Sequence, residues 1–269
     1  MKNIEENHIE FVANHYEQGK LDTQKALAKF KRDKGIRPTK RNPFLRWSAV
    51  AASVAIGAFV LTRIVFLPQS EWVNLSAEGE TLIAYLPDST KVVLTEGSTL
   101  SYDIADYGKD GRHVNMSGEV FFKVTRNEQS PFEVTAKTSK VEVLGTQFLV
   151  DENDDNTQLY VESGKVRFSA ADDSSSEVLT KGMSAELGSD NIVAVVDNTT
   201  SNPAAWATGK FVYENTPISE VLKELSAFYG VTITATNNSK ALTASFSTEN
   251  LEEIITIIES VLNVKIERR

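Results

Sequence analysis

The longest apolar run of the chain covers residues 47–67, WSAVAASVAIGAFVLTRIVFL, and contains a single charge, Arg63. A helix needs about 20 mostly apolar residues to cross the roughly 30 Å hydrocarbon layer of a membrane, and only a helix satisfies its own backbone amides there. The run therefore predicts one transmembrane helix at residues 47–67. The 46 residues before it argue against a cleavable secretory signal, which is usually about 15 to 30 residues in total.

The residues before this run have helical spacing. Residues 4–32 predict two short amphipathic helices separated at Gly19, and the second would begin at Asp22 or Thr23. Two such helices cannot bury their apolar faces alone, so they are either marginally ordered or fold against a cytoplasmic partner. Residues 33–46 have the proline and charge content of a linker. The apolar faces consist of Ile9, Val12 and Tyr16 in the first helix and Ala26, Leu27 and Phe30 in the second.

Beyond the apolar run, short alternating segments are separated by turn signals such as PDST, EGS and ESGK. Many short strands without helices between them predict a β-sandwich, barrel or stacked β-roll for residues 75–198, followed by a short linker, DNTTSNPAA. The predicted strands are Glu80–Tyr85, Lys91–Leu94, Thr99–Tyr102, Arg112–Met116, Glu119–Val124, Phe132–Ala136, Lys140–Leu144, Gln147–Val150, Gln158–Glu162, Lys165–Ser169, Glu177–Thr180, Ser184–Leu187 and Ile192–Val195.

Residues 208–269, at the end of the chain, contain an internal repeat. Two segments, FVYENTPISEVLKELSAFYGVTI and FSTENLEEIITIIESVLNVKI, each predict a strand, an amphipathic helix and a second strand. Helix starts are expected at Pro217 and at Asn250, which has Glu253 three residues later. The segments predict a small β-α-β-β-α-β interaction domain. The matched apolar positions are Val221, Leu222, Leu225, Phe228, Val231 and Ile233 in the first segment and Ile254, Ile255, Ile258, Val261, Val264 and Ile266 in the second.

Charge predicts the orientation in the membrane. The twenty residues before Trp47 contain eight Lys and Arg residues, whereas residues 68–87 contain none. By the positive-inside rule, the N-terminus stays in the cytoplasm and the C-terminal part is exported. Residues 1–46 carry a net charge of +5 and residues 68–269 a net charge of −15. The acidic exported part is a poor candidate for nucleic-acid binding, which depends on Lys and Arg contacts with phosphates.

Candidate catalytic and metal-binding residues are few. The chain has no cysteine, which excludes disulfides, thiol nucleophiles and thiolate metal sites. The exported part has one histidine, His113, and no nucleophile motif accompanies it, so we interpret His113 as an ordinary strand residue. We therefore expect no enzyme activity, cofactor or metal.

A calcium-loop spacing occurs between two predicted strands. Asp151, Asn153, Asp155 and Glu162 occupy the first, third, fifth and twelfth positions of such a loop. No helices are predicted on either side, and the same residues suit a polar hairpin, which is the interpretation we favour.

Several spaced motifs resemble the FecR family of membrane-spanning sigma-factor regulators. They are LPDSTKVVLTEGSTLSY, VNMSGEVFFKV, SPFEV, VEVLGTQFLV, VESGKVRF, KGMSAEL and AWATGKFVYENTPISEVLKELSAFYGV, which span about residues 78–235 in order. The C-terminal repeat resembles the short βαβ domain of secretins and TonB-dependent receptors. HYEQGKLDTQKALAKF is similar to the shortened anti-sigma regions of some family members. At Ser89 the family usually has a glycine, so we expect a local change in that turn.

The resemblance implies a function that agrees with the topology. It implies an inner-membrane protein whose cytoplasmic N-terminus binds an extracytoplasmic-function sigma factor. Its periplasmic part would contact the signalling domain of a TonB-dependent outer-membrane receptor, and stepwise proteolysis would release the sigma factor. The alternative is a membrane-anchored periplasmic adaptor for envelope assembly that has no sigma-factor partner.

The resemblance also draws attention to the peptide bond between Gly145 and Thr146. Some members of the family cleave themselves at a Gly-Thr bond, where the threonine hydroxyl attacks the preceding carbonyl and exchanges an amide for an ester. One hypothesis is therefore that residues 1–145 and 146–269 are two chains within one fold. The other is that Gly145 is a strand or bulge glycine and that the chain stays intact.

Overall fold

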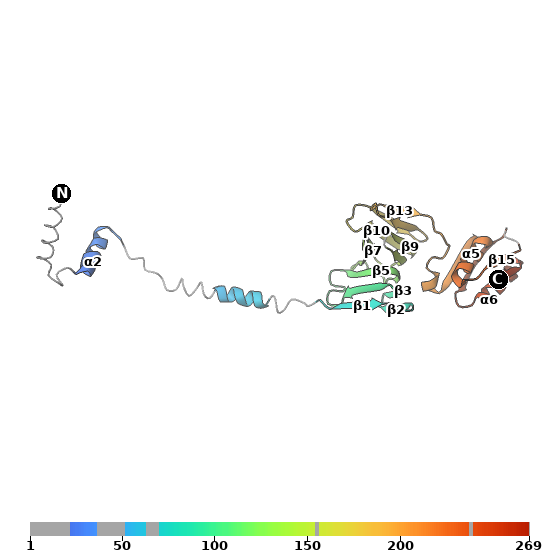
Figure 1. The fold of residues 1–269 in the computed structure, drawn as a ribbon, viewed down its shortest axis with the longest axis horizontal. Coiled ribbons are helices and arrows are strands. Elements are labelled where there is room, and N and C mark those ends of the chain that lie inside the picture. The colour runs from blue at the N-terminus through green and yellow to red at the C-terminus, as the bar shows by residue number, and fades with distance from the viewer. Residues whose placement is uncertain (1–21, 37–51, 63–69, 154–155, 237–238, 269) are drawn as a thin grey trace, which may run out of the picture. The chain divides into compact units, whose positions relative to one another are not determined.

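The computed structural model describes residues 22–36, 52–62, 70–153, 156–236 and 239–268. The chain forms two compact units, Met1–Leu67 and Pro68–Arg269. Of the first unit, Figure 1 draws residues 22–36 and 52–62 in colour, and both segments contain a helix; the second unit is a large β domain followed by a smaller lobe that contains helices.

The first unit contains helix α2, Thr23–Asp33. The Asp22 side chain caps it by accepting hydrogen bonds from the backbone N–H groups of Gln24 and Lys25, both at 3.1 Å, so the helix begins where the sequence predicts. The first predicted helix lies outside the described residues. Residues 52–62 of the predicted transmembrane run are helical, and residues 47–51 and 63–67 lie outside the described part. In the portion of the chain that the structure describes, no helix combines the length and the hydropathy required to cross a membrane.

The β domain is built from thirteen strands that form one sheet folded into two layers around strand β5. The prediction of a mainly β protein with a C-terminal α+β region is confirmed. The predicted strands Arg112–Met116 and Glu119–Val124 are a single strand, and β1 had no predicted counterpart. The strands are β1 Trp72–Ser76, β2 Leu82–Tyr85, β3 Lys91–Leu94, β4 Thr99–Asp103, β5 Arg112–Lys123, β6 Phe132–Thr135, β7 Ser139–Val143, β8 Gln147–Glu152, β9 Thr157–Ser163, β10 Lys165–Ala170, β11 Ser176–Thr180, β12 Ser184–Leu187 and β13 Val193–Val196.

Strand β5 belongs to both layers. Its first half pairs with β4 and β6, and its second half pairs with β3 and β8. The change occurs at Gly118, which has a φ of 84° and where a Cβ atom would lie 2.5 Å from Ser98 Oγ. Only glycine fits this backbone conformation and this close approach. The first layer contains β1, β4, β6, β7, β10 and β11, and the second contains β2, β3, β8, β9, β12 and β13. The inner faces of both layers supply one continuous apolar core, which includes Leu94, Phe122, Phe132, Phe148 and Phe168.

An ion pair between Arg112 and Asp88 connects the start of β5 to the β2–β3 turn. Arg112, whose side chain is 2% exposed, donates a 2.6 Å hydrogen bond to Asp88 and further bonds to the backbone carbonyls of Thr125 and Ser130. Partial burial raises the pKa of Asp88, but hydrogen bonds from Arg112, Thr90 and Tyr107 outweigh this effect and hold the pKa below its ordinary value. The stability from this lowered pKa is therefore present above the ordinary value of 3.8 and is lost as the pH falls through the lowered pKa.

The turn that carries Asp88 keeps a glycine-like backbone although it contains Ser89. The N–H of Ser89 donates to the carbonyl of Leu86 at 2.9 Å, and the N–H of Leu86 donates to the carbonyl of Thr90 at 2.9 Å. This is a three-residue hairpin in which the third residue must be left-handed, and Ser89 has a φ of 66°. The expectation of a changed turn is therefore wrong. The hairpin is fixed by the strand register and by the bonds of Asp88, so the serine adopts a strained conformation instead.

The C-terminal lobe has the predicted β-α-β-β-α-β order. Asn250 caps α6, and its side chain accepts a 3.2 Å hydrogen bond from the N–H of Glu253, as predicted. Pro217 is instead the last residue of β14 and the N-cap of α5. Phe228 in the first repeat and Val261 in the second are a matched apolar pair, and both side chains are exposed. The elements are β14 Lys210–Pro217, α5 Ile218–Tyr229, β15 Ile233–Ala235, β16 Ala241–Ser247, α6 Leu251–Leu262 and β17 Ile266–Arg268.

We predict that Ser89→Gly stabilises the β domain by about 0.5–1 kcal/mol. Glycine removes the left-handed strain of roughly 1–2 kcal/mol, and part of this gain is offset by the greater freedom of the unfolded chain. Urea unfolding of residues 68–269 measures the change. Ser101→Gly in the extended strand β4 is the control, and we expect it to destabilise the domain. A destabilised Ser89→Gly variant would contradict the account of this turn.

Candidate interaction site

The outer face of the second layer carries an apolar row that crosses five strands. The strand register places Ile83, Val93, Phe121, Leu149 and Tyr160 side by side, from β2 to β9. Four of them are at most 9% exposed, although they point away from the main core. A second apolar cluster explains their burial, because the segment before β14 packs against them.

This covering segment contains the short helix α4, Ala205–Thr208. Ala204, Trp206 and Ala207 pack against the apolar row of the β domain, whereas Ala205 belongs to the core of the C-terminal lobe. Ala204 and Ala205, the last two residues of the predicted linker, thus belong to two different apolar cores. A segment that contributes to both cores couples the β domain to the C-terminal lobe.

Asn202 connects the same segment to the C-terminal lobe through hydrogen bonds with Glu224 and Val212. Its backbone N–H and its side-chain amide donate to the carboxylate of Glu224 at 2.7 and 3.0 Å. Its side-chain carbonyl accepts a 2.6 Å hydrogen bond from the N–H of Val212. Glu224 is only 8% exposed, so these bonds satisfy a carboxylate that would otherwise be costly to bury. We call residues 202–208 the connecting segment.

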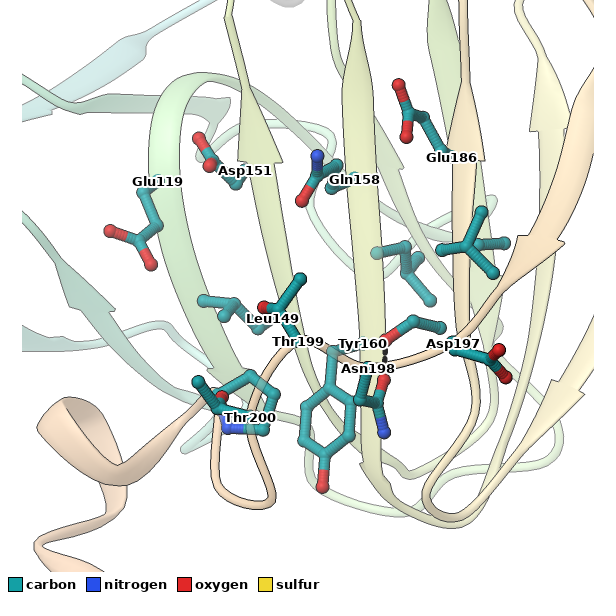
Figure 2. Close-up of a pocket in the computed structure, with 15 residues that line it drawn as sticks. Glu119, Leu149, Asp151, Gln158, Tyr160, Glu186, Asp197, Asn198, Thr199 and Thr200 are labelled. Carbon is teal, nitrogen blue, oxygen red and sulfur yellow. Dashed lines mark hydrogen bonds between the residues drawn. The ribbon is translucent and has the colours of Figure 1, made fainter. Parts of the chain in front are cut away.

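On one side of the connecting segment, the outer face forms an acidic pocket of about 360 Å³. Figure 2 shows Glu119, Asp151, Gln158 and Glu186 in a row above Leu149 and Tyr160. Asp197 also lines the pocket, and no lysine or arginine does. Burial is the main cause that raises the pKa of Glu119, and the neighbouring Asp151 carboxylate raises it further. Burial also raises the pKa of Asp151. The pocket therefore attracts positive charge, which would relieve the repulsion between these carboxylates.

Acyl-transfer chemistry has no support at this site. Carboxylates, hydroxyls and two side-chain amides line the pocket, and neither a histidine nor a cysteine does. His113 lies on β5 outside the pocket, is 59% exposed and faces Glu133 at 3.5 Å, as expected for a strand residue. Across the described ranges, no cluster of three or more His, Asp or Glu side chains is arranged to hold a metal ion.

The structure separates the residues of the calcium-loop spacing. Asp151 lines the acidic pocket, whereas Glu162 lines a different cavity on the other side of Tyr160. Asn153 accepts a 3.1 Å hydrogen bond from the N–H of Asn156 within the β8–β9 turn, and Asp155 lies outside the described residues. Because β8 and β9 pair as a hairpin, Asp151 and Glu162, the first and twelfth residues of the loop spacing, line two different cavities. The polar-hairpin interpretation agrees with this arrangement.

Gly145 and Thr146 lie directly before β8. A Cβ atom on Gly145 would lie 2.5 Å from Arg126 Cα, so this position requires glycine for close backbone approach. Thr146 is 4% exposed. Its hydroxyl donates a 2.8 Å hydrogen bond to the carbonyl of Lys165 and accepts one from the N–H of Lys165 at 3.3 Å. The hydroxyl thus links the residue before β8 to the first residue of β10. Its proton is directed to an amide carbonyl, which is not a base that activates a nucleophile.

Trp206 and Asn202 are the residues that sequence reasoning missed. Both lie in or next to a stretch that reads as a linker because of its Asn, Thr, Ser and Pro content. The available signal was the tryptophan itself, because a large apolar side chain next to a polar linker usually has a surface to cover.

In the second unit, a two-layer β domain and an α+β lobe are joined across an apolar face that the connecting segment covers, with an acidic pocket beside it. Comparison with family models matches residues 75–167 to the FecR protein family and residues 210–269 to the family described as FecR, C-terminal. The chain therefore belongs to the FecR family.

Comparison with solved structures gives two similar crystal structures of a proposed anti-sigma factor from Parabacteroides distasonis, at 1.65 and 2.50 Å resolution. Each is 25% identical in sequence, covers 72% of this chain and 93% of its own chain, and has a TM-score of 0.47. A search of the curated proteins found no match.

We predict that Thr146 has a structural role and that the purified protein is one intact chain of 29.7 kDa. Thr146→Val should destabilise residues 68–269 by about 1–3 kcal/mol, because it leaves the Lys165 backbone unpaired. The exposed Thr99→Val in β4 is the control. Mass spectrometry and a denaturing gel measure the chain, and urea unfolding measures the stability. Fragments of residues 1–145 and 146–269 that disappear in Thr146→Val would show self-cleavage instead.

We also predict that Trp206→Ala uncouples the two parts of the second unit. Calorimetry of residues 68–269 should show one transition for the natural sequence. Two transitions are expected for Trp206→Ala, because the apolar row loses the indole that covers it. Trp72→Ala is the matched control, since Trp72 is 53% exposed and lies on β1. A single transition that merely moves to a lower temperature in Trp206→Ala would contradict the coupling.

Proposed function

We propose that this FecR-family protein is a single-pass inner-membrane signal transducer. Its N-terminal residues 1–46 bind an extracytoplasmic-function sigma factor in the cytoplasm. Its second unit lies in the periplasm and responds to the signalling domain of a TonB-dependent outer-membrane receptor. Release of the sigma factor proceeds by stepwise proteolysis, because a single membrane helix transmits force poorly. The observation that carries the proposal is the match of two FecR models to two separate parts of the second unit, residues 75–167 and 210–269.

The proposed placement in the membrane rests on the sequence. Residues 47–67 are long and apolar enough to cross a bilayer, and the basic residues before them contrast with their absence in residues 68–87. The second unit is acidic and has its own apolar cores, which suits a domain that folds outside the cytoplasm without disulfides.

The sigma-factor partner is supported by the exposed face of α2. Leu27 is 53% exposed and Phe30 is 56% exposed, and none of the residues of this helix is buried. An eleven-residue helix with an exposed apolar face is marginally stable alone and gains stability when that face is covered. A sigma factor that docks on this face would order the N-terminal segment.

The test is a pulldown with immobilised residues 1–46 from a lysate of the source organism, with the bound proteins identified by mass spectrometry. The natural segment should recover an extracytoplasmic-function sigma factor. Leu27→Ser together with Phe30→Ser should reduce recovery by at least about tenfold, because apolar anchors dominate such contacts.

The matched control is Ala28→Ser, which changes the same helix outside the face formed by Ala26, Leu27 and Phe30 and keeps its charge. This variant should retain the sigma factor. If the natural segment recovers no sigma factor, the alternative gains support, namely a membrane-anchored periplasmic adaptor for envelope assembly.

A further inference from the structure

A second cavity, of about 350 Å³, lies on the other side of the connecting segment from the acidic pocket. Phe121 and Gln147 of the β domain line it together with Thr208 and Val212 of the connecting segment and β14. Three lysines also line it, Lys91 from β3, Lys123 from β5 and Lys210 from β14. We call this cavity the basic cleft.

The strand register explains why the two cavities have opposite charge. Lys91 and Lys123 are direct register partners on β3 and β5, one row beyond the apolar row that contains Phe121. Glu119 and Asp151 are register partners one row on the other side of it. Helix α4 lies over the apolar row between these charged rows. The face is thus divided into an acidic and a basic half by a single covering segment.

The lysines of the basic cleft are available to an external anion. Glu162 is the one carboxylate that lines the cleft, and within the described residues none of the three lysines forms an ion pair. In contrast, Lys140 on β7 is paired with Glu133 at 2.8 Å. The unit as a whole carries a net charge of −15, so a concentration of three lysines around one carboxylate is a local reversal of charge rather than part of a basic surface.

Exposed apolar side chains border the cleft. Tyr85 is the register partner of Lys91 and is 69% exposed, and Ile83 on the same face of β2 is 56% exposed. Val212, which lines the cleft from β14, is 42% exposed. Large apolar groups beside unpaired charges are typical of protein-binding surfaces, where the apolar groups supply affinity and the charges supply selectivity.

We propose that the basic cleft binds an acidic peptide segment of a second protein, with carboxylates at Lys91, Lys123 and Lys210 and an apolar side chain against Tyr85 or Val212. This inference rests on the proposed function for the location of that partner outside the membrane, and it names the surface that the partner contacts. Because Lys123 belongs to the β domain and Lys210 to the C-terminal lobe, the bound segment bridges the two parts that the connecting segment couples. Binding therefore strengthens their coupling.

The test uses residues 68–269, which form one compact unit with cores made from their own residues. The probe is a short fluorescein-labelled peptide of four glutamates around one leucine, and fluorescence polarisation measures binding. The same peptide with glutamine in place of glutamate is the neutral probe. The acidic probe should bind at least about tenfold more tightly than the neutral one, with an affinity that falls as salt is added.

Two variants with the same change in net charge separate the cleft from the overall field. Lys91→Glu with Lys123→Glu should lower the affinity of the acidic probe by at least about tenfold. Lys181→Glu with Lys265→Glu changes two exposed lysines that do not line the cleft and should leave the affinity within about twofold. Urea unfolding confirms that both variants are folded.

Three outcomes would overturn the proposal. Equal losses in the two double variants would show a general charge effect. Equal binding of the acidic and neutral probes would exclude carboxylate recognition. Complete displacement of the acidic probe by millimolar inorganic phosphate would show a small-anion site only. None of these outcomes affects sigma-factor recovery by residues 1–46, so failure of this inference is distinguishable from failure of the proposed function.

Discussion

The constraint on which the second unit depends is the passage of β5 from one layer of the β domain to the other. A twelve-residue strand that pairs with four neighbours commits both layers to one register, and Gly118 permits the change of partners because a side chain would collide with Ser98. Arg112 anchors the first residue of this strand to Asp88. The register then determines which side chains reach the outer face, so the apolar row and both charged rows follow from it.

The connecting segment joins the C-terminal lobe to this outer face of the β domain. Without it, Val93, Phe121, Leu149 and Tyr160 would form an exposed apolar patch, which is unfavourable for a domain surrounded by water. Covering the row with Trp206 and two alanines buries it and brings the C-terminal lobe with it, because Asn202 and Ala205 belong to that lobe's own network and core. The coupling of the two parts is therefore a consequence of hydrophobic burial, with the hydrogen bonds of Glu224 fixing the geometry.

The distribution of charge suits a protein that acts by binding. Acidic and basic cavities lie on either side of the same covering segment. The hydroxyl of the candidate nucleophile, Thr146, donates its hydrogen bond to the backbone carbonyl of Lys165 in β10. In the N-terminal unit, Leu27 and Phe30 of α2 are exposed. The proposed function assigns this face to a sigma factor and the second unit to a periplasmic partner.

The sequence by itself determined the β-rich second unit, most of its strands, the C-terminal repeat, the Asn250 cap and the family, because these depend on local periodicity, turn chemistry and motif order. It did not determine that Arg112–Met116 and Glu119–Val124 are one strand, that Ser89 keeps a left-handed turn, or that Trp206 covers the outer face. These features depend on contacts between residues far apart in the chain. The row from Ile83 to Tyr160 and its charged borders exist only when the strands align, so the tertiary structure alone brought the site together.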